Sequence, residues 1–195
     1  MGKIFYIMGK SSTGKDTIFK QLLMDTRIKL KTIVPYTTRP IRRGETNGVE
    51  YFFSNEEELQ GLESSGKLIE LRTYDTFHGK WRYFTALDQQ IDLNFHDYLM
   101  IGTLDSYNKT KVFFGDKKIV PILIELDDGI RLQRALNREK KQKMPKYEEM
   151  CRRFLADSAD FSKENIKAAG ITRIFYNDNL RCCQNEIVDY ILVNL

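Results

Sequence analysis

The sequence predicts an α/β protein built on a parallel sheet. Short apolar runs alternate with segments of helical periodicity towards both ends of the chain. Two of the runs, residues 97–104 and 119–126, are nearly continuous in apolar character, which is typical of strands buried on both faces. Strands and helices that alternate in this way wind with right-handed crossovers. We therefore expect about five parallel strands flanked by helices.

The strongest motif follows the first predicted strand, residues 3–8. Gly9–Thr17 reads Gly-Lys-Ser-Ser-Thr-Gly-Lys-Asp-Thr and leads directly into a predicted helix. A strand, a glycine-rich turn, a lysine and a helix N-terminus form a phosphate cradle, because backbone N–H groups converge on one anion. A turn that binds nothing is the alternative, but it leaves Lys15 unexplained. The candidate phosphate-binding residues are Gly9, Ser11, Ser12, Thr13, Gly14, Lys15, Asp16 and Thr17.

This motif departs from the P-loop pattern G-x-x-x-x-G-K-[ST] at one position. Asp16 stands where a hydroxyl is usual, and Thr17 supplies the nearest hydroxyl. A carboxylate beside a triphosphate is repelled unless it turns away or holds a magnesium ion. We therefore predict that Thr17 contacts Mg²⁺ through the nucleotide, with Asp16 as a second candidate.

Residues 35–85 are predicted to be mostly β structure, unlike the chain on either side. The segment Thr37–Glu45 carries three arginines between residues 39 and 43, bracketed by Pro40 and Gly44. A solvated charge cluster is one explanation, and a loop that grips an oxyanion through bidentate arginine contacts is the other. We expect a small sheet lobe inserted into the α/β core. Its predicted elements are strands at 49–53, 68–74 and 81–85 and a helix opened by a capping box at Ser54.

The remaining chain returns to alternating elements. A basic helix is expected from Asp128 to Lys143, and Pro145 begins a second one. Their basic residues either serve a function or simply form a solvent-exposed helix face. Pro121 argues that its strand lies at an edge or contains a bulge. The other predicted elements are a helix at 86–93, a helix capped by Asp105 or Ser106 and ending at Gly115, a strand at 171–175 and a final helix opened by Asn177–Asn179.

Composition narrows the functional class. The net charge of +4, from 31 basic and 27 acidic residues, is too small to indicate nucleic-acid binding but suits a site for polyanions. The three cysteines, Cys151, Cys182 and Cys183, have no metal-ligand spacing, so we expect no zinc and a reduced, cytoplasmic location. No apolar run approaches the length of a membrane span, and we expect no membrane association.

Two further segments resemble guanylate kinases. Thr37–Phe53 closely resembles the T-T-R-x-x-R-x-G-E-x-x-G-x-x-Y-x-F segment of that family, and Asn177–Leu180 resembles its N-D-x-L turn. The resemblance runs from Lys3 to about Leu195. It implies a P-loop fold that transfers a phosphoryl group from ATP to GMP with Mg²⁺. It also implies one domain, 1–195, with a core (1–34 and 86–195), an acceptor-binding lobe (35–85) and a basic helical lid (about 131–153).

The resemblance assigns roles to individual residues. Glu70 is expected to accept hydrogen bonds from guanine N1 and N2, which selects guanine because adenine lacks those donors. Asn177 is expected to lie behind the adenine of ATP. The implied GMP-binding residues are Arg39, Arg42, Glu45, Tyr51, Glu70, Tyr83, Thr85 and Asp105. The implied catalytic residues are Lys15, Arg39, Arg134, Arg138 and Arg153.

The chain departs from the family pattern around the base. The departures are Pro35 and Tyr36 in place of small hydroxyl residues, Phe84 in place of glycine, and Gly102 and Leu104 in place of an Asp-x-Asp pair, with Asp105 as the nearest carboxylate. Two alternatives therefore stay open: a kinase of the same fold with another acceptor, such as ribose bisphosphate, and a non-catalytic interaction module. We expect ATP and GMP as small-molecule partners and a monomer or homodimer.

Overall fold

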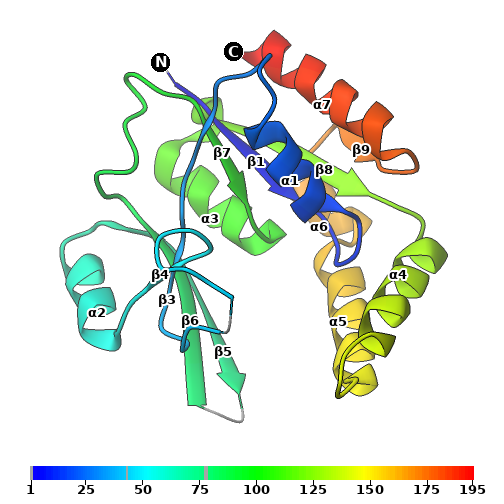
Figure 1. Cartoon of the computed structure of the whole chain (residues 1–195). Helices are drawn as coiled ribbons and strands as arrows, with labels where there is room; N and C mark the ends of the chain where they lie inside the picture. The colour runs from blue at the N-terminus through cyan, green and yellow to red at the C-terminus, as the bar shows by residue number, and fades with distance from the viewer. Residues whose placement is uncertain (1, 43, 77–78) are drawn as a thin grey trace.

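The computed structural model describes residues 2–42, 44–76 and 79–195 (Figure 1). Arg43 of the basic loop lies outside the described residues. The elements form two sheets, and helices cover the larger one. None of the helices in the described ranges is both long enough and apolar enough to cross a membrane.

The larger sheet is parallel and has five strands, in the order β2-β7-β1-β8-β9, as the sequence predicts. All five residues of β1 are buried, which explains their uninterrupted apolar character. The strands are β1 (Ile4–Met8), β2 (Lys31–Thr32), β7 (Tyr98–Ile101), β8 (Ile119–Glu125) and β9 (Ile174–Tyr176).

Alternating side chains of β1 serve the two faces of this sheet. Phe5 and Ile7 belong to one core cluster, with residues of α1 and α7. Ile4 and Tyr6 belong to the other, with residues of α3 and α6. The helices are α1 (Lys15–Leu23), α2 (Glu56–Ser64), α3 (Leu104–Phe114), α4 (Asp128–Lys140), α5 (Tyr147–Asp160), α6 (Lys163–Ala168) and α7 (Leu180–Asn194), with a 3₁₀ turn at Asp116–Lys118.

The smaller sheet is mixed and has the order β4-β3-β6-β5. β3 and β4 pair parallel, whereas β6 pairs antiparallel with β3 and β5. Its strands are β3 (Tyr36–Thr37), β4 (Phe52–Phe53), β5 (Leu68–Thr76) and β6 (Gly79–Ala86). The Lys109 ammonium of α3 donates to the Leu71 carbonyl of β5 at 3.0 Å, which ties this sheet to the core.

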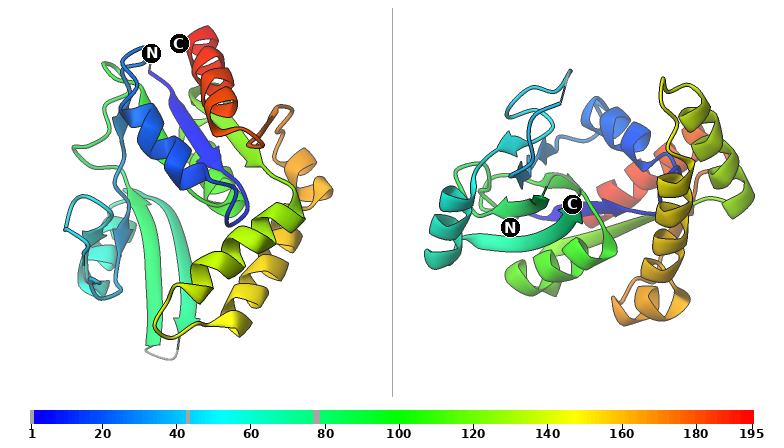
Figure 2. Two further views of the ribbon diagram at one scale, coloured as in Figure 1. Left: turned by 45° about the vertical axis from the view of Figure 1, so that its right-hand side comes forward. Right: turned by 90° about the horizontal axis from the view of Figure 1, so that it is seen from below.

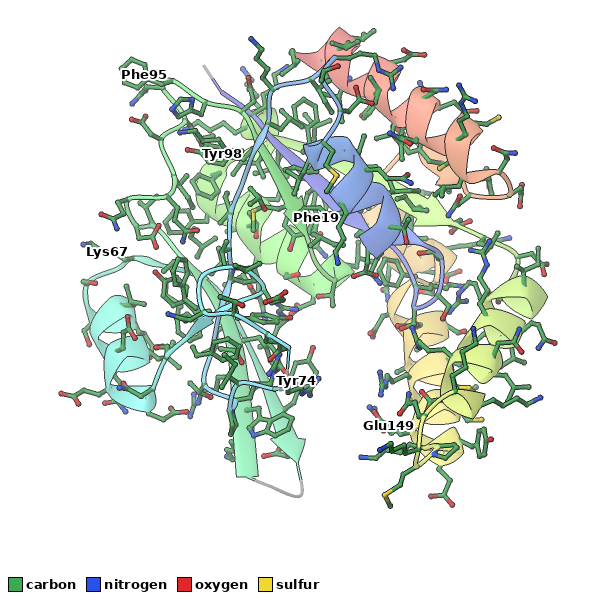
Figure 3. All side chains as sticks on the ribbon, in the orientation of Figure 1. Phe19, Lys67, Tyr74, Phe95, Tyr98 and Glu149 are labelled. Carbon is green, nitrogen blue, oxygen red and sulfur yellow. The ribbon has the colours of Figure 1, made fainter. Side chains whose placement is uncertain are left out.

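The helices α4 and α5 pack against each other on the far side of the molecule from the smaller sheet. Figures 1 and 2 show this from three directions. Figure 3 labels Tyr74 on β5 and Glu149 on α5, one on each side. The β1–α1 turn lies on the side of α4 and α5, where the Ser11 amide donates to Asp157 of α5 at 2.6 Å.

The helix predicted at 86–93 is wrong, since residues 87–97 are irregular. Short polar side chains there bond to nearby backbone and compete with helical hydrogen bonds. The Asp88 carboxylate accepts from the Gln90 amide at 2.8 Å, and the Gln90 side chain accepts from the Val34 amide at 3.0 Å. The Asp92 carboxylate accepts from the Asn94 amide at 3.0 Å.

Three smaller predictions also differ from the structure. Asn55 caps α2 instead of Ser54, and Thr103 caps α3 instead of Asp105 or Ser106. Ser106 completes a capping box with Thr103 and stands where the usual motif has Glu or Gln. Pro121 lies in an interior strand, but β9 pairs with β8 only from Leu123 onward, so the proline lies beyond the end of that partner.

Candidate active site

Two glycines shape the loop between β1 and α1. Gly9 has φ +155°, and a Cβ there would lie 2.3 Å from the Ile124 carbonyl oxygen. Gly14 has φ +90° at the start of α1, and a Cβ there would lie 2.4 Å from Nδ2 of Asn177. Side chains at either position would collide with the surrounding structure. Glycine therefore lets the chain curl tightly from the strand into the helix N-terminus.

Ser12 lies between these glycines in a left-handed conformation, with φ 66°. This conformation costs an L-residue about 1–2 kcal/mol. Its hydroxyl is buried without a hydrogen-bond partner among the described residues. Backbone strain and unpaired polar atoms of this kind concentrate at ligand-binding loops. The loop shape therefore fits an anion cradle better than an ordinary turn.

The start of α1 carries the charged groups of the loop. The Lys15 ammonium lies 3.4 Å from the Asp16 carboxylate, which is exposed. Thr17 is also exposed on the same turn. Within the described ranges there is no cluster of three or more metal-ligating side chains. The oxygens of Asp16 and Thr17 fit a hydrated magnesium ion carried by a nucleotide, which keeps most of its ligands as water and phosphate.

A buried arginine that the sequence analysis did not select holds the loop from behind. Arg131 of α4 is 1% exposed, and its Nε donates to the Ser11 carbonyl at 3.0 Å. Its guanidinium pairs with Asp128 and lies 3.4 Å from Asp157 of α5. The Asp157 carboxylate accepts from the Ser11 amide at 2.6 Å. These contacts tie the loop to α4 and α5. In the sequence, the spacing of Asp128 and Arg131 by one helical turn was the available signal for their ion pair.

Asn177 occupies a similar supporting position. Its side chain is buried, and its Nδ2 donates to the Thr13 carbonyl at 2.7 Å. Its Oδ1 is buried without a partner in the described part of the chain. The structure thus places Asn177 directly behind the loop, where it supports the conformation of Thr13 and Gly14. Its contact with ATP stays a prediction.

The smaller sheet carries the candidate acceptor residues. Arg39 is 3% exposed and donates two parallel hydrogen bonds to Glu45, at 2.8 and 2.6 Å. These bonds lower the pKa of Glu45 to about 2. The Glu45 carboxylate also accepts from the Arg42 amide at 2.8 Å, so it holds both arginines in the loop. The Arg39 guanidinium lies over the Tyr51 ring at 5.1 Å.

Tyr51 and Tyr83 lie beside this arginine. Their ring centroids are 5.6 Å apart, in an edge-to-face arrangement. Burial raises the pKa of Tyr51, with the neighbouring Tyr83 as a further cause, so its phenol stays protonated. The Nε of Arg39 is buried without a partner among the described residues. Protonated phenols and arginine N–H groups are hydrogen-bond donors for a phosphate. The structure brings together four of the residues predicted to bind GMP: Arg39, Glu45, Tyr51 and Tyr83.

Glu70 lies farther along β5 and is already well engaged. It is 3% exposed, and its Oε1 accepts from the Thr85 hydroxyl at 2.9 Å. Arg72, which the sequence analysis did not select, donates to it through Nε at 3.0 Å and Nη2 at 3.1 Å. The i, i+2 spacing of Glu70 and Arg72 places both side chains on one face of the strand, and this alternation was the available signal for the pair.

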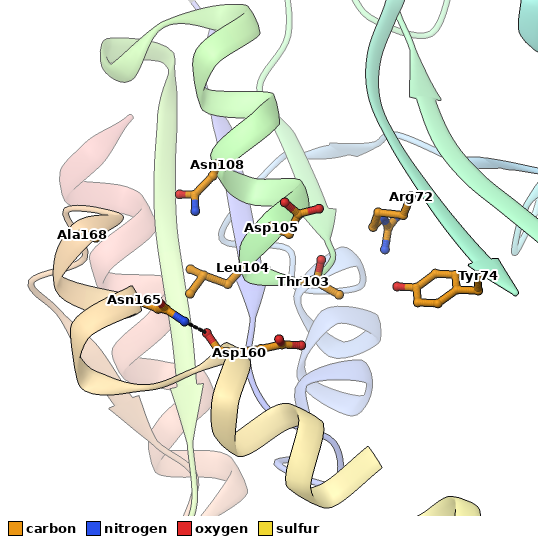
Figure 4. Close-up of a pocket in the computed structure, with 9 residues that line it drawn as sticks. All are labelled: Arg72, Tyr74, Thr103, Leu104, Asp105, Asn108, Asp160, Asn165 and Ala168. Carbon is orange, nitrogen blue, oxygen red and sulfur yellow. Dashed lines mark hydrogen bonds between the residues drawn. The ribbon is translucent and has the colours of Figure 1, made fainter. Parts of the chain in front are cut away.

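Asp105 lies at the start of α3 and forms an ion pair with Lys109 at 2.8 Å. It contributes to a cavity of about 330 Å³ between β5, α3 and the end of α5. Figure 4 shows Arg72 and Asp105 directed at the same space, with the Asp160 carboxylate on the opposite side. The lining residues are Arg72, Tyr74, Thr103, Leu104, Asp105, Asn108, Asp160, Asn165 and Ala168.

The candidate lid arginines are exposed and lie away from the acceptor residues. Nη1 of Arg134 would be 3.7 Å from a Cβ at Gly14, so this arginine lies beside the loop. The Nε of Arg153 donates to Glu149 at 2.9 Å, and Arg138 is exposed on α4. Within the described residues, no hydrogen bond or ion pair joins α4 or α5 to the smaller sheet. The structure therefore brings Arg134 to the loop but leaves Arg138 and Arg153 apart from Arg39.

Two of the departures from the family pattern are coupled through space. Tyr36 and Phe84 are cross-strand partners in β3 and β6, and their rings stack at 5.2 Å. The Tyr36 hydroxyl donates to Asp88 at 2.5 Å. A third departure, Gly102, faces Tyr6, since a Cβ at Gly102 would lie 2.2 Å from the Tyr6 hydroxyl. Aspartate therefore cannot occupy position 102 while Tyr6 stays in place.

Known proteins resemble this chain in sequence and in fold. The guanylate kinase family model matches residues 1–92. The guanylate kinase of Chlorobaculum tepidum is 30% identical over 173 residues, 86% of this chain and 76% of that relative. The guanylate kinase of Mycoplasmoides gallisepticum is 40% identical over 73 residues, 37% of each chain, and that of Protochlamydia amoebophila is 32% identical over 103 residues. This chain therefore covers only 37% of the length of the M. gallisepticum relative and 51% of the length of the P. amoebophila relative.

A solved structure shares the fold. The crystal structure of guanylate kinase from Anaplasma phagocytophilum superimposes with a TM-score of 0.63 over 98% of this chain and 85% of that chain. The sequence identity is 21%, so this likeness concerns the arrangement of the elements.

Proposed function

Because this chain belongs to the guanylate kinase family, we propose that it transfers a phosphoryl group from ATP to GMP, giving ADP and GDP. The observation that carries the proposal is the pairing of two phosphate sites in one molecule. A strained glycine loop with Lys15 opens α1, and a buried arginine with two phenols lies in the smaller sheet. Phosphoryl transfer needs such a pair of grips, because alignment and charge neutralisation supply most of its catalysis.

The donor side is formed by the loop. Backbone N–H groups between Gly9 and Gly14 and the Lys15 ammonium bind the ATP phosphates, and Arg131 and Asn177 hold the loop in shape. Magnesium bound with ATP would neutralise phosphate charge, near Asp16 and Thr17. Arg134 is close enough to the loop to join the transferring group.

The acceptor side is formed by the smaller sheet. Arg39 and Arg42, oriented by Glu45, together with Tyr51 and Tyr83 hold the acceptor phosphate in line with the donor. Glu70 and Thr85 face the base. Movement of α4 and α5 towards the sheet would bring Arg138 and Arg153 to the site and exclude water.

The domain division follows the same functional logic. We propose residues 1–34 and 86–195 as the core, 35–85 as the acceptor-binding lobe and about 131–153 as the lid. The separate mixed sheet and the outlying α4–α5 pair support this division. A cytoplasmic location and a monomeric or dimeric state stay predictions.

The test is a panel of acceptors. ADP release is measured with ATP and each of GMP, dGMP, AMP, CMP, UMP and ribose bisphosphate, for the wild type, Lys15→Ala and the matched surface change Lys20→Ala. We expect GMP to accelerate ADP release in the wild type and in Lys20→Ala, and Lys15→Ala to lose roughly a hundredfold or more. Equal rates for all three proteins would refute the proposal.

Two alternatives have distinct signatures in the same assays. Stimulation by ribose bisphosphate and not by GMP would indicate another acceptor, which the departures at Tyr36 and Phe84 make worth testing. An interaction module would show no thermal stabilisation by ATP, since only a ligand that binds the folded state raises its unfolding temperature.

A further inference from the structure

The Glu70 carboxylate has little capacity left for a base. An ionised carboxylate offers about four acceptor positions. Three of them are taken, by Thr85 and by two N–H groups of Arg72. A guanine edge brings two donors, at N1 and N2, and therefore needs two positions. Guanine cannot make both bonds while Arg72 keeps both of its own.

Arg72 is held firmly in this pair. Its side chain is 18% exposed, and that of Glu70 is 1% exposed. Burial alone would lower the pKa of Arg72, but the charge and hydrogen bonds of Glu70 raise it overall. The pair is therefore a charged, bidentate contact of the stronger kind, and a ligand must displace it at a cost.

We propose that Arg72 is a specificity-determining residue of the acceptor site, which competes with the guanine edge for Glu70 and so weakens selection for the N2 amino group. This inference rests on the proposed function, because it assumes that Glu70 faces the acceptor base. Arg72 acts through Glu70 and does not touch the reacting atoms.

The neighbouring cavity offers Arg72 a second position. Asp105 and Asp160 line it together with Arg72 (Figure 4). Asp105 is already paired with Lys109, so Asp160 is the cavity carboxylate that can take up Arg72. Burial raises the pKa of Asp160, and repulsion from Asp157 and Asp105 adds to this effect. An arginine that leaves Glu70 can turn into this space and remain paired. On guanine binding, Glu70 would then exchange Arg72 for the guanine edge, and Arg72 would exchange Glu70 for a carboxylate of the cavity.

The consequence concerns the choice between purines. Hypoxanthine shares the N1 hydrogen of guanine but lacks the N2 amino group, so it needs one acceptor position on Glu70. In the wild type one position is free, and GMP and IMP should bind with affinities within about threefold of each other. Without Arg72, guanine makes both bonds, and an added hydrogen bond to a charged group is worth about tenfold in affinity.

The experiment measures GMP and IMP on the same proteins. Trp81, the only tryptophan of the chain, lies on β6 with the Arg42 guanidinium 5.8 Å from its ring, so its fluorescence reports binding. Titrations and initial rates are compared for the wild type, Arg72→Met, Arg72→Lys and the control Arg82→Met. Arg82 lies on the neighbouring strand and pairs with Glu56 at 2.9 Å, away from Glu70.

We expect Arg72→Met to raise the preference for GMP over IMP about tenfold through KM, with little change in kcat. Arg72→Lys should lie between the two, because lysine makes a single-point contact. Arg82→Met should keep the wild-type ratio. A fall or no change in the ratio for a folded Arg72→Met would overturn the inference, because it would show that Arg72 supports Glu70.

If the variants do not fold, the GMP and IMP affinities of the wild type alone still test the inference. A wild-type preference for GMP over IMP above about thirtyfold would overturn the inference. If both nucleotides bind but ADP release is not stimulated, the proposed function fails while the affinity ratio still tests Arg72. If neither nucleotide binds, both proposals fail.

Discussion

The glycine loop and the smaller sheet, the two phosphate sites that we propose, are built in different ways. The loop relies on backbone: glycines at Gly9 and Gly14, a strained Ser12, and a buried arginine that holds main-chain atoms. The sheet relies on pairs of side chains, Arg39 with Glu45 and Arg72 with Glu70. Backbone sites tolerate few substitutions, because the main chain itself must fit. Side-chain pairs can be exchanged, so specificity can change there without loss of the fold.

The largest effect expected from this contrast is at Arg131, which supports the loop. Arg131→Met leaves Asp157 and the Ser11 carbonyl without their buried partner, and we expect a loss of about 3 kcal/mol in the free energy of unfolding. Arg152→Met removes an exposed ion pair with Glu149 and should cost less than about 1 kcal/mol. Urea denaturation measures both. Similar losses of stability in Arg131→Met and Arg152→Met would mean that the loop does not depend on the contacts of Arg131.

The next effect tests the glycines. Gly9→Ala places a Cβ against the Ile124 carbonyl and should cost about 1–3 kcal/mol and weaken ATP binding. Gly61→Ala is the matched change in exposed helix α2, where a Cβ has open space. It should stabilise the protein by about 0.5–1 kcal/mol. Thermal unfolding with and without ATP compares them, and equal behaviour would contradict a backbone-built cradle.

The sheet is tested through the pH dependence of Glu45. Its pKa is lowered from 4.5 to about 2 by Arg39, so its contribution to stability is complete above about pH 4.5 and is lost as the pH falls towards 2. Glu45→Gln should therefore be less stable than the wild type at pH 7, and the difference should shrink between pH 4.5 and 2. Chemical denaturation at several pH values measures it. A difference independent of pH would show that the charge of Glu45 does not matter.

The smallest effect concerns the strain at Ser12. Ser12→Gly removes the left-handed penalty and should stabilise the protein by about 1 kcal/mol. The same substitution at Ser64, the last residue of α2, removes a hydrogen bond to the Gln60 carbonyl and should destabilise the protein by about 0.5 kcal/mol, because glycine is a poor helix former. Differential scanning calorimetry compares the two variants. A destabilised Ser12→Gly would mean that the Ser12 side chain contributes to the loop.

Much of the molecule could be anticipated from patterns within a few residues. The parallel five-stranded sheet was confirmed because continuous apolar runs record burial on both faces. The helix predicted at 86–93 failed because the side chains of Asp88 and Asp92 offer the backbone local hydrogen bonds that periodicity does not count. The strand predicted at 49–53 shortened to Phe52–Phe53, because its partner β3 has only two residues.

Local sequence therefore sufficed for the glycine loop, since its glycines, lysine and helix start are contiguous and act through their own backbone. The side-chain pairs of the proposed acceptor site come from tertiary structure. Tyr36 packs on Phe84, and Arg72 pairs with Glu70 beside a cavity that Asp105 also lines, because sheet register and helix packing bring distant segments together. Such contacts depend on long-range pairing, which no short window of sequence contains.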